Sequence, residues 1–364
     1  MKKILFFMPN IERGGIEKNL IILSNYFEKK NYSIEIVYGQ ISNIVSKKIN
    51  KKVRKTKVKK FIDFTYLNPR IVNTINCFFY LLFFYSFRKE EKILSFQDHP
   101  IAIFISLLKK LKCIIRIANH PVGSLKFYNS KIIFIIKLYI KNFSYLFSDG
   151  IICNSMASTN YFKKKFKSKK IITIYNPIQI KKDMKNKIRN NQIISVGRLQ
   201  NQKNFHGLIK AFNLIKDNFK ETNLIIIGSG SYLKSLKKLS KNLNLSKRVI
   251  FYKYQNPSNF IKKSKIFILN SLWEGLPNIL IETQNYLTPI ISTNCLSGPD
   301  EILKNGKYGY LVPINNEIKL AKKIKYVLSN YKEATQKSKL AFKDLGRFDI
   351  SNQCKKYDNF LKQF

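Results

Sequence analysis

Short apolar runs of strand length alternate with segments of helical periodicity along most of this chain of 364 residues. The run Lys3–Met8 is followed by a turn at Asn10–Gly15 and by Ile16–Lys29, whose apolar residues recur at helical spacing. Strand, glycine-containing turn and helix in this order are typical of doubly wound α/β domains. The alternation restarts at Gln192–Val196, and the chain is long enough for two such domains.

A polar segment separates the two alternating halves. Residues 181–191 carry Lys, Asp, Arg and Asn with little periodicity, which is typical of a linker. We therefore predict a first domain at residues 1–180, a linker at 181–191, a second domain at 192–345 and a C-terminal segment at 346–364 that contains a last helix.

The chain is strongly basic, with 67 Lys and Arg against 21 Asp and Glu and a formal charge of +46. Nucleic acid, anionic lipid and phosphorylated substrates are the partners that such a charge attracts. The excess is mostly Lys, and Ile and Asn are also frequent, as compositional bias alone would produce. The charge is spread along the chain and the aromatic residues lie in apolar runs, which argues against a nucleic-acid-binding protein.

Two segments bear on membrane contact. Lys47–Lys60 carries Lys or Arg at nine of fourteen positions; we predict a solvated loop, with a surface for anionic headgroups as the alternative. Ile71–Phe87 carries no charge but is shorter than the roughly 20 residues of a typical span. We predict a buried helix there, with a membrane-dipping helix as the alternative, and no transmembrane segment.

The cysteines and histidines point to no metal site. The five Cys include no CxxC pair, and Cys77, Cys113 and Cys153 lie inside apolar runs, which favours buried, reduced thiols in a cytosolic protein. Three His, no clustered ligands and no DxD leave neither a zinc site nor a carboxylate pair for a divalent cation.

The segment Trp273–Glu282 (WEGLPNILIE) follows an apolar strand-like run and carries the strongest functional signal. Gly275 and Pro277 turn the chain, an apolar-periodic run begins at Asn278, and we predict a helix there with Pro277 at its first position. The free N–H groups of a helix start favour phosphate. Glu274 and Glu282 could accept hydrogen bonds from sugar hydroxyls, although a solvated pair of acids is the plain alternative.

Further candidates lie in the turns after other predicted strands. Arg198 and Lys203 occupy a strand-to-helix connection where two cations can converge on an anion. His120 follows the predicted strand Cys113–Ala118, where α/β folds place ligand groups, although a structural loop histidine is the alternative; His99 follows another strand and is the weaker candidate. Gly14, Gly15 and Gly228 lie in turns where backbone could approach a ligand closely.

Several of these motifs together resemble the retaining GT-B glycosyltransferases of family 4, also called glycosyl transferases group 1. WEGLPNILIE resembles the family's E-x7-E motif, and Gly197-Arg198-Leu199 with Lys203-Asn204 resembles its G-R-L-x-x-x-K-N. The stretch Thr288–Pro313, with its Gly-Pro-x-Glu loop, is similar to the continuation of the family pattern. The resemblance is close in the C-terminal half and loose in the N-terminal half, and Lys253 stands where a Gly is usual.

The resemblance implies a GT-B fold, in which two Rossmann-like doubly wound domains face a central cleft and the C-terminal helix crosses back to the first domain. It implies retaining, metal-independent transfer of a hexose or N-acetylhexosamine from a UDP-sugar, with no other cofactor. The implied acceptor is a surface-polysaccharide glycan or one linked to polyprenyl diphosphate or lipid A. We therefore expect a cytoplasmic enzyme, peripheral on the inner face of the bacterial cytoplasmic membrane, with an anionic membrane surface as a further partner.

The resemblance also assigns roles to the candidate residues. Arg198 and Lys203 would hold the diphosphate, Glu282 the ribose, and Glu274 and His120 the transferred sugar. The remaining donor-binding positions are Gly14, Gly15, Gly228, Gly275, Leu276, Asn278 and Ile279. An inactive GT-B scaffold is an alternative, but the joint presence of both cations and both acids argues against it. An epimerase would lack this pairing of motifs, and a phosphorylase would normally be longer.

Overall fold

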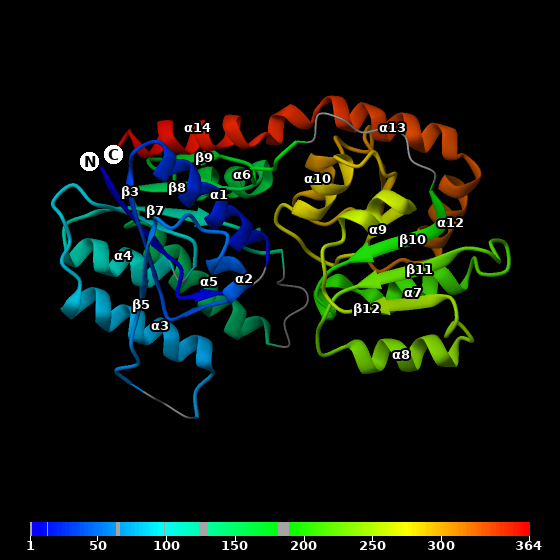
Figure 1. The fold of residues 1–364 in the computed structure, drawn as a ribbon, viewed down its shortest axis with the longest axis horizontal. Coiled ribbons are helices and arrows are strands. Elements are labelled where there is room, and N and C mark those ends of the chain that lie inside the picture. The colour runs from blue at the N-terminus through cyan, green and yellow to red at the C-terminus, as the bar shows by residue number, and fades with distance from the viewer. Residues whose placement is uncertain (1, 13, 63–65, 98, 124–129, 181–188) are drawn as a thin grey trace. The chain divides into compact units, whose positions relative to one another are not determined.

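The computed structural model describes all residues except 1, 13, 63–65, 98, 124–129 and 181–188. The chain divides into two compact units (Figure 1). Unit 1 comprises residues 1–121, 125–177 and 350–364, and unit 2 comprises residues 122–124 and 178–349. Each unit is built around its own parallel sheet, which confirms the predicted class of two Rossmann-like α/β domains.

The sheet of unit 1 has seven strands in the order β5-β3-β1-β6-β7-β8-β9. All of its strand pairs are parallel, as expected for apolar runs joined by helical crossovers. The strands are β1 (Lys3–Phe7), β3 (Ser33–Tyr38), β5 (Arg54–Lys57), β6 (Lys92–Ser95), β7 (Lys112–Ile117), β8 (Gly150–Cys153) and β9 (Lys170–Thr173). Two short strands, β2 (Asn10–Ile11) and β4 (Gln40–Ile41), pair separately.

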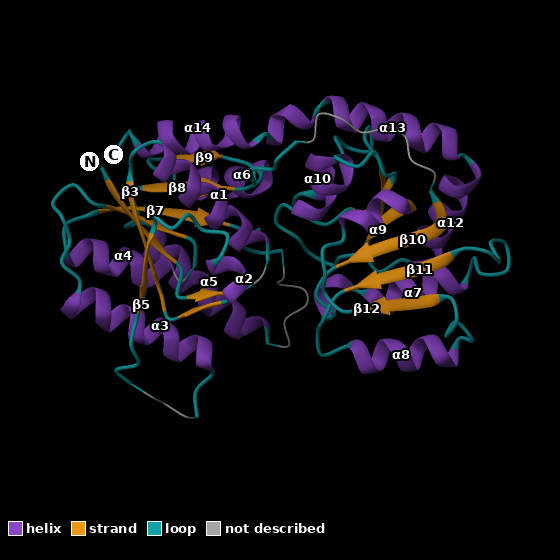
Figure 2. Ribbon diagram, in the orientation of Figure 1, coloured by secondary structure: helices purple, strands orange, loops and turns teal. Residues whose placement is uncertain are grey.

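Helices cover both faces of this sheet (Figure 2). The helices of unit 1 are α1 (Gly15–Lys29), α2 (Asn43–Ser46), α3 (Pro69–Phe79), α4 (His99–Leu108), α5 (Lys131–Tyr145), α6 (Met156–Lys165) and α14 (Ile350–Leu361). Apolar side chains of α1 and α14 share one core with strand residues such as Phe6. A second core joins α3, α4 and α6 to the alternate strand residues such as Phe7. The period-two alternation of buried strand side chains therefore supplies both cores.

The basic segment Lys47–Lys60 was predicted as a loop, and the structure corrects this. Arg54–Lys57 forms the edge strand β5 and pairs with β3. Val53 and Val58 on either side of it are buried, at 1% and 4% exposure, and they fix the strand to the core. Basic residues suit an edge strand because they discourage pairing with another chain.

The uncharged segment Ile71–Phe87 forms most of α3 and a π-helical turn, Tyr80–Phe84. Val72, Cys77 and Leu81 are buried, but Ile71, Phe83 and Phe84 are exposed, so only one face of the predicted buried helix is covered. The π-turn adds a residue to the helical repeat and moves the following side chains around the axis. No helix among the described residues has the length and apolar character needed to cross a membrane.

The sheet of unit 2 has six parallel strands in the order β12-β11-β10-β13-β14-β15. They are β10 (Asn190–Val196), β11 (Asn223–Ile227), β12 (Val249–Tyr252), β13 (Ser264–Leu269), β14 (Ile290–Thr293) and β15 (Tyr310–Val312). The helices are α7 (Phe205–Asn213), α8 (Leu233–Asn242), α9 (Ser258–Lys263), α10 (Asn278–Gln284), α11 (Pro299–Ile302), α12 (Glu317–Ser329) and α13 (Tyr331–Lys343), with 3₁₀ turns at Asn201–Lys203 and Leu345–Phe348.

The boundaries of the units differ in detail from the predicted ones. Most of the predicted linker, residues 181–188, lies outside the described residues. Residues 190 and 191 belong to β10, because the strand extends far enough for Asn190 to pair with Ser264 of β13. Residues 178–180 and 346–349 belong to unit 2, where Ile178 donates a backbone hydrogen bond to Phe348. Helix α14, the last helix of the chain, packs within unit 1.

Candidate functional site

The topology of each sheet marks one place where a ligand site is expected. In unit 2 the chain moves outward from β10 through β11 to β12 and then returns to β13 on the other side of β10. The carboxyl ends of β10 and β13 therefore flank a topological switch point, where open α/β sheets bind their ligands. Arg198 and Lys203 follow β10, and Glu274 follows β13. Sequence-predicted residues thus converge on the position that the topology favours.

The turn after β10 packs directly against the turn after β11. The backbone N–H of Leu199 donates to Ser229 at 2.9 Å, and that of Gly197 donates to Ile227 at 3.0 Å. A Cβ atom at Gly228 would lie 1.9 Å from the carbonyl oxygen of Gly197. Only glycine fits at position 228. The close approach of the two backbone turns is therefore sufficient to explain why a glycine stands there.

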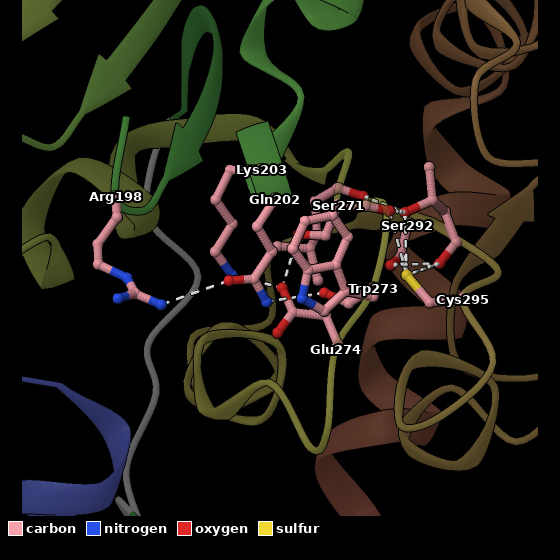
Figure 3. A network of polar contacts seen from close by, with 10 residues as sticks. Arg198, Gln202, Lys203, Ser271, Trp273, Glu274, Ser292 and Cys295 are labelled. Atoms are coloured by element: carbon pink, nitrogen blue, oxygen red, sulfur yellow. Dashed lines mark hydrogen bonds and ion pairs between the residues drawn. The ribbon is translucent and has the colours of Figure 1, made fainter. Parts of the chain in front are cut away.

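The turns after β10 and β13 are also joined. Leu272 donates its backbone N–H to Gln202 at 2.8 Å, and the Gln202 side-chain amide donates to the Trp273 carbonyl at 2.8 Å (Figure 3). The Gln202 side-chain oxygen accepts from Arg198 at 3.3 Å. Gln202 therefore links the exposed guanidinium of Arg198 to the segment that carries Glu274.

Lys203 and Glu274 form an ion pair in which both side chains are largely covered, with 15% and 8% exposure. Ser271 adds a hydroxyl that donates to the same carboxylate oxygen at 2.6 Å. A carboxylate this far out of water needs such partners, because its desolvation penalty is several kcal/mol. The two residues were predicted to act on different parts of a ligand, and the structure brings them into contact with each other.

Lys203 is held in place by a local feature of the backbone. It ends the 3₁₀ turn Asn201–Lys203, and the following Asn204 has a left-handed conformation with φ 44°. Asn adopts this conformation more readily than most residues, and its side chain caps α7 by accepting from Gly207. The Asn204 carbonyl also accepts from Asn270 at 2.9 Å. The Lys-Asn pair therefore combines a candidate ligand-binding cation with a structural cap.

Cys295 lies beside this ion pair. Its thiol approaches the Ser271 carbonyl at 3.1 Å, and burial together with the charge of Glu274 raises the pKa of Cys295 to about 12 (Figure 3). A thiol with so high a pKa is protonated at neutral pH and is a poor nucleophile. All five cysteines are buried and none forms a disulfide within the described residues, which agrees with the predicted buried, reduced thiols.

The loop from Gly275 to Ile279 packs on the loop that contains Gly298. The Gly275 carbonyl accepts from Ser297 at 3.1 Å, and a Cβ at Gly298, which has φ 94°, would lie 2.1 Å from that carbonyl. The α10 helix begins at Asn278 as predicted, but Pro277 is its N-cap rather than its first residue, with an extended ψ of 101°. This conformation places Gly275 and Leu276 in the buried turn and leaves Asn278 and Ile279 half-buried.

Glu282 lies on α10, which ends two residues later at Gln284. The side chain of Glu282 is half-buried, whereas Leu280 and Ile281 are buried in the core of the unit. Glu274 and Glu282 are thus both placed in unit 2, on either side of the Gly275–Pro277 turn.

Of the predicted residues of unit 1, Gly14 and Gly15 follow β1, whose carboxyl end is at the switch point of that sheet. Gly14 and Gly15 are exposed and open α1. Asn19 donates to the Gly15 carbonyl at 2.9 Å and to Asn176 at 3.1 Å. Asn176 also accepts from Arg116, so the glycine turn is tied to the strand β7.

Arg116 is a buried residue rather than an exposed contact. It is 1% exposed, and its Nε donates to the Tyr357 hydroxyl of α14 at 2.9 Å. His120 follows β7, and its ring packs on that of Tyr161 with 5.6 Å between the ring centroids. Burial lowers the pKa of His120, so the imidazole is neutral at pH 7. Its Nδ1 has no hydrogen-bond partner among the described residues.

His99 has a structural role. Its Nδ1 lies 2.8 Å from the Ser95 hydroxyl, and its ring packs edge-on against Tyr145. Burial lowers the pKa of His99 to about 3, so the ring stays uncharged over the physiological range. This arrangement agrees with its place as the weaker candidate in the sequence.

Four polar residues that contact the predicted positions, three in unit 2 and one in unit 1, were missed by sequence reasoning. Gln202, Ser271, Ser297 and Asn19 position the predicted residues through hydrogen bonds. Ser271 directly follows the predicted strand and precedes Glu274 by three positions, so its place in the turn was a usable signal. The other three depend on contacts between distant segments, and nothing local in the sequence marks them.

The chain is similar to proteins of known family and fold. Residues 178–344 match the family model described as glycosyl transferases group 1. An uncharacterized glycosyltransferase of Haemophilus influenzae is 26% identical over 359 residues, covering 95% of this chain and 97% of the relative. An undecaprenol-PP-glycan α-1,4-N-acetyl-D-galactosaminyltransferase of Campylobacter jejuni is 26% identical, covering 97% of this chain and 96% of the relative.

Among solved structures, the Anabaena protein HepE in complex with UDP-glucose superposes with a TM-score of 0.80 at 16% identity, covering 100% of both chains. This likeness concerns the fold, and the family match and the two relatives concern the activity. The chain with its two Rossmann-like units is therefore a glycosyltransferase with the GT-B fold.

Proposed function

We propose that this glycosyltransferase moves a hexose or N-acetylhexosamine from a UDP-sugar to a lipid-linked or surface-polysaccharide glycan. The observation that carries the proposal is the grouping of Arg198, Lys203 and Glu274 at the switch point of unit 2. Two cations suit a diphosphate, and a carboxylate suits sugar hydroxyls. The UDP-glucose bound to the fold neighbour and the undecaprenol-linked acceptor in the name of the Campylobacter relative support the same substrate classes.

The cations supply the main chemical contribution in this proposal. A departing diphosphate gains charge as the sugar bond breaks, and fixed cations stabilise that charge most in the transition state. Arg198 is exposed and tethered through Gln202, so it is available to a phosphate, and Lys203 can exchange its bond to Glu274 for one to the diphosphate. No divalent metal or further cofactor takes part in this proposal.

The remaining residues orient the donor. Glu274, released by Lys203, accepts from hydroxyls of the transferred sugar, and Glu282 accepts from the ribose. The backbone of Gly275, Leu276, Asn278 and Ile279 and the turn at Gly228 line the nucleotide. Gly14 and Gly15 are further proposed donor-binding positions, and neutral His120 is a proposed contact of the sugar. Transfer with retention follows from attack on the face that the diphosphate leaves, with that phosphate accepting the proton of the acceptor.

Calorimetric titration with UDP, and with GDP for comparison, tests the donor site. We expect wild type to bind UDP preferentially, and Arg198→Ala and Lys203→Met to bind it about 10- to 100-fold more weakly, since a charge-assisted hydrogen bond contributes about 1.5–3 kcal/mol. Lys210→Met is the matched control, because Lys210 is an exposed lysine on α7 in the same unit. Equal UDP affinity in all four proteins would overturn the assignment of the site.

A second measurement separates the enzyme from the inactive scaffold. Incubation with a panel of UDP-hexoses and UDP-N-acetylhexosamines and a polyprenyl-diphosphate glycan should transfer one of the sugars, and NMR of the product should show the anomeric configuration of the donor. A protein that binds UDP but neither transfers sugar to any acceptor nor hydrolyses the donor would favour the inactive GT-B scaffold.

Because the proposed acceptor is lipid-linked, we propose that the enzyme works on the inner face of the bacterial cytoplasmic membrane.

A further inference from the structure

Helix α5 of unit 1 has its apolar side chains on the outside. Ile132, Ile136, Tyr139, Ile140 and Phe143 are between 52% and 72% exposed. At 3.6 residues per turn these side chains fall within an arc of roughly 160° together with the exposed Ile133, Ile135 and Phe147. A surface helix normally turns such a stripe toward the core. Here the amphipathic pattern is reversed.

The buried side of α5 anchors the helix to the rest of unit 1, and the apolar stripe takes no part in this anchoring. Of its described side chains, only Asn142 and Tyr145 are buried. Tyr145 packs on His99 of α4 and on Phe162 of α6. These contacts lie toward the C-terminal end of the helix and on the side opposite the apolar arc. Removing exposed side chains from the arc would therefore leave the anchoring contacts intact.

The neighbouring helix also exposes apolar side chains. Helix α4 packs against α5, and its residues Phe104, Leu107 and Leu108 are about half-exposed. Large exposed apolar patches on soluble proteins mark interaction surfaces. The apolar arc of α5 is therefore a candidate interaction surface, and α4 beside it adds further exposed apolar side chains.

The charges around this face identify its partner. Lys137 and Lys141 are exposed and lie beyond one edge of the apolar arc on α5, by about 40° and 80° at roughly 100° per residue. Lys165 of α6 lies with its Nζ 5.6 Å from the centre of the Tyr139 ring. Helices α4, α5 and α6 contain no Asp or Glu in their sequences. An apolar stripe with lysines beside it and no acidic residue on these helices is the pattern of helices that lie in the interface of an anionic bilayer.

We propose that the exposed face of α5 is a membrane-docking surface, which inserts its isoleucine and aromatic side chains into a bilayer containing anionic lipid while Lys137, Lys141 and Lys165 contact the headgroups. The docking surface itself is argued independently of the proposed function. Only its biological purpose, to bring the enzyme to a lipid-linked acceptor, rests on the proposed function. The basic segment Lys47–Lys60 and the uncharged segment Ile71–Phe87 are not needed for it.

Vesicle flotation with the full chain tests the proposal. We expect wild type to float with vesicles of phosphatidylcholine and phosphatidylglycerol and much less with phosphatidylcholine alone. Ile136→Ser with Phe143→Ser should lower the partition coefficient about 100-fold, since removing one large apolar side chain corresponds to roughly tenfold. Lys137→Gln with Lys141→Gln should lower it about fivefold per lysine, and roughly 1 M salt should have a similar effect on wild type.

The matched control is Ile318→Ser with Leu340→Ser, which removes two exposed apolar side chains from unit 2, at 62% and 43% exposure. It should float as wild type does. The thermal midpoint and UDP affinity of every variant should also match wild type, which separates loss of docking from loss of folding or of the donor site. UDP binding without flotation would reject the docking proposal and leave the proposed function standing.

Two results would overturn the proposal. One is flotation of the Ile136 and Phe143 double variant at the wild-type level. The other is absence of wild-type flotation at low salt, together with a wild-type dimer in analytical ultracentrifugation that the double variant loses; this would assign the face to a second copy of the chain.

Discussion

Arg189 provides the sharpest test of how unit 2 is held together. It precedes β10, and its two Nη groups donate to the carbonyls of Lys262, Ser264, Tyr286 and Leu287 at 2.9–3.0 Å and to the Thr288 hydroxyl at 2.8 Å. These acceptors belong to two segments, the α9–β13 junction and the α10–β14 connection. A planar guanidinium presents several N–H donors in a fork and can bind both segments at once. A lysine ammonium is a compact point charge and could not bridge them in the same way.

We expect Arg189→Met to lower the free energy of unfolding of unit 2 by about 3 kcal/mol. Each hydrogen bond from a charged donor contributes roughly 1.5–3 kcal/mol, and several are lost together. The full sum is not expected, because the side chain is partly exposed and water can reach some of the freed carbonyls. For a unit of this size, a loss of about 3 kcal/mol corresponds to a fall in Tm of roughly 6–12 °C.

Tryptophan fluorescence during thermal denaturation measures this directly, because Trp273 is the single tryptophan of the chain and lies in unit 2. Arg198→Met is the matched control: Arg198 is exposed and makes one side-chain hydrogen bond, at 3.3 Å, so its Tm should stay within about 2 °C of wild type. If Arg189→Met also unfolded within that margin, the guanidinium contacts would contribute nothing net and the reasoning would be refuted.

Three further outcomes are expected. Gly228→Ala should lower stability by more than about 2 kcal/mol, because its Cβ would meet a carbonyl at 1.9 Å, whereas Gly346→Ala, with nothing within 4 Å, should not; equal thermal midpoints would contradict this. Burial opposes ionisation of Glu35, but hydrogen bonds outweigh it and lower its pKa, so its contribution is present above pH 4.5 and lost as pH falls further. Urea unfolding at several pH values should therefore show a weaker acid dependence for Glu35→Gln than for wild type. Tyr357→Phe should destabilise unit 1 by about 1–3 kcal/mol in calorimetry, since Arg116 Nε loses its acceptor; an unchanged unit 1 transition would argue against that bond.

The parts of the structure that could be predicted are those set by local sequence. Strand runs such as Gln192–Val196 and the turns after them follow from apolar patterning and glycine, and the structure has a strand at Asn190–Val196. The grouping of Arg198, Lys203 and Glu274 could be anticipated because the ends of parallel strands meet at one edge of a sheet. The ion pair between Lys203 and Glu274 could not be anticipated, because it depends on the precise backbone conformation of the two turns.

Arg189 shows why the rest was out of reach. In the sequence it is one basic residue in a polar, aperiodic segment, and it was assigned to the linker. Its partners lie 73 to 99 positions away, so no local pattern distinguishes it from its lysine neighbours. Helix α5 shows a second limit, because a helical apolar stripe does not state whether the stripe faces a core or a partner.

The pairing of Lys203 with Glu274 gives the two predicted roles a common physical basis. A carboxylate buried at this depth without a counter-charge would be costly, so the protein without a ligand needs Lys203 where it is. When a diphosphate takes over the lysine, the carboxylate needs other donors, and sugar hydroxyls are suitable ones. Under the proposed function, a nucleotide alone would draw Lys203 away and leave Glu274 with Ser271 only, whereas a nucleotide sugar would supply partners for both charges. Discrimination between the two then arises from the cost of an unpaired carboxylate, and Glu274→Gln should reduce the preference for UDP-sugar over UDP in calorimetric titration.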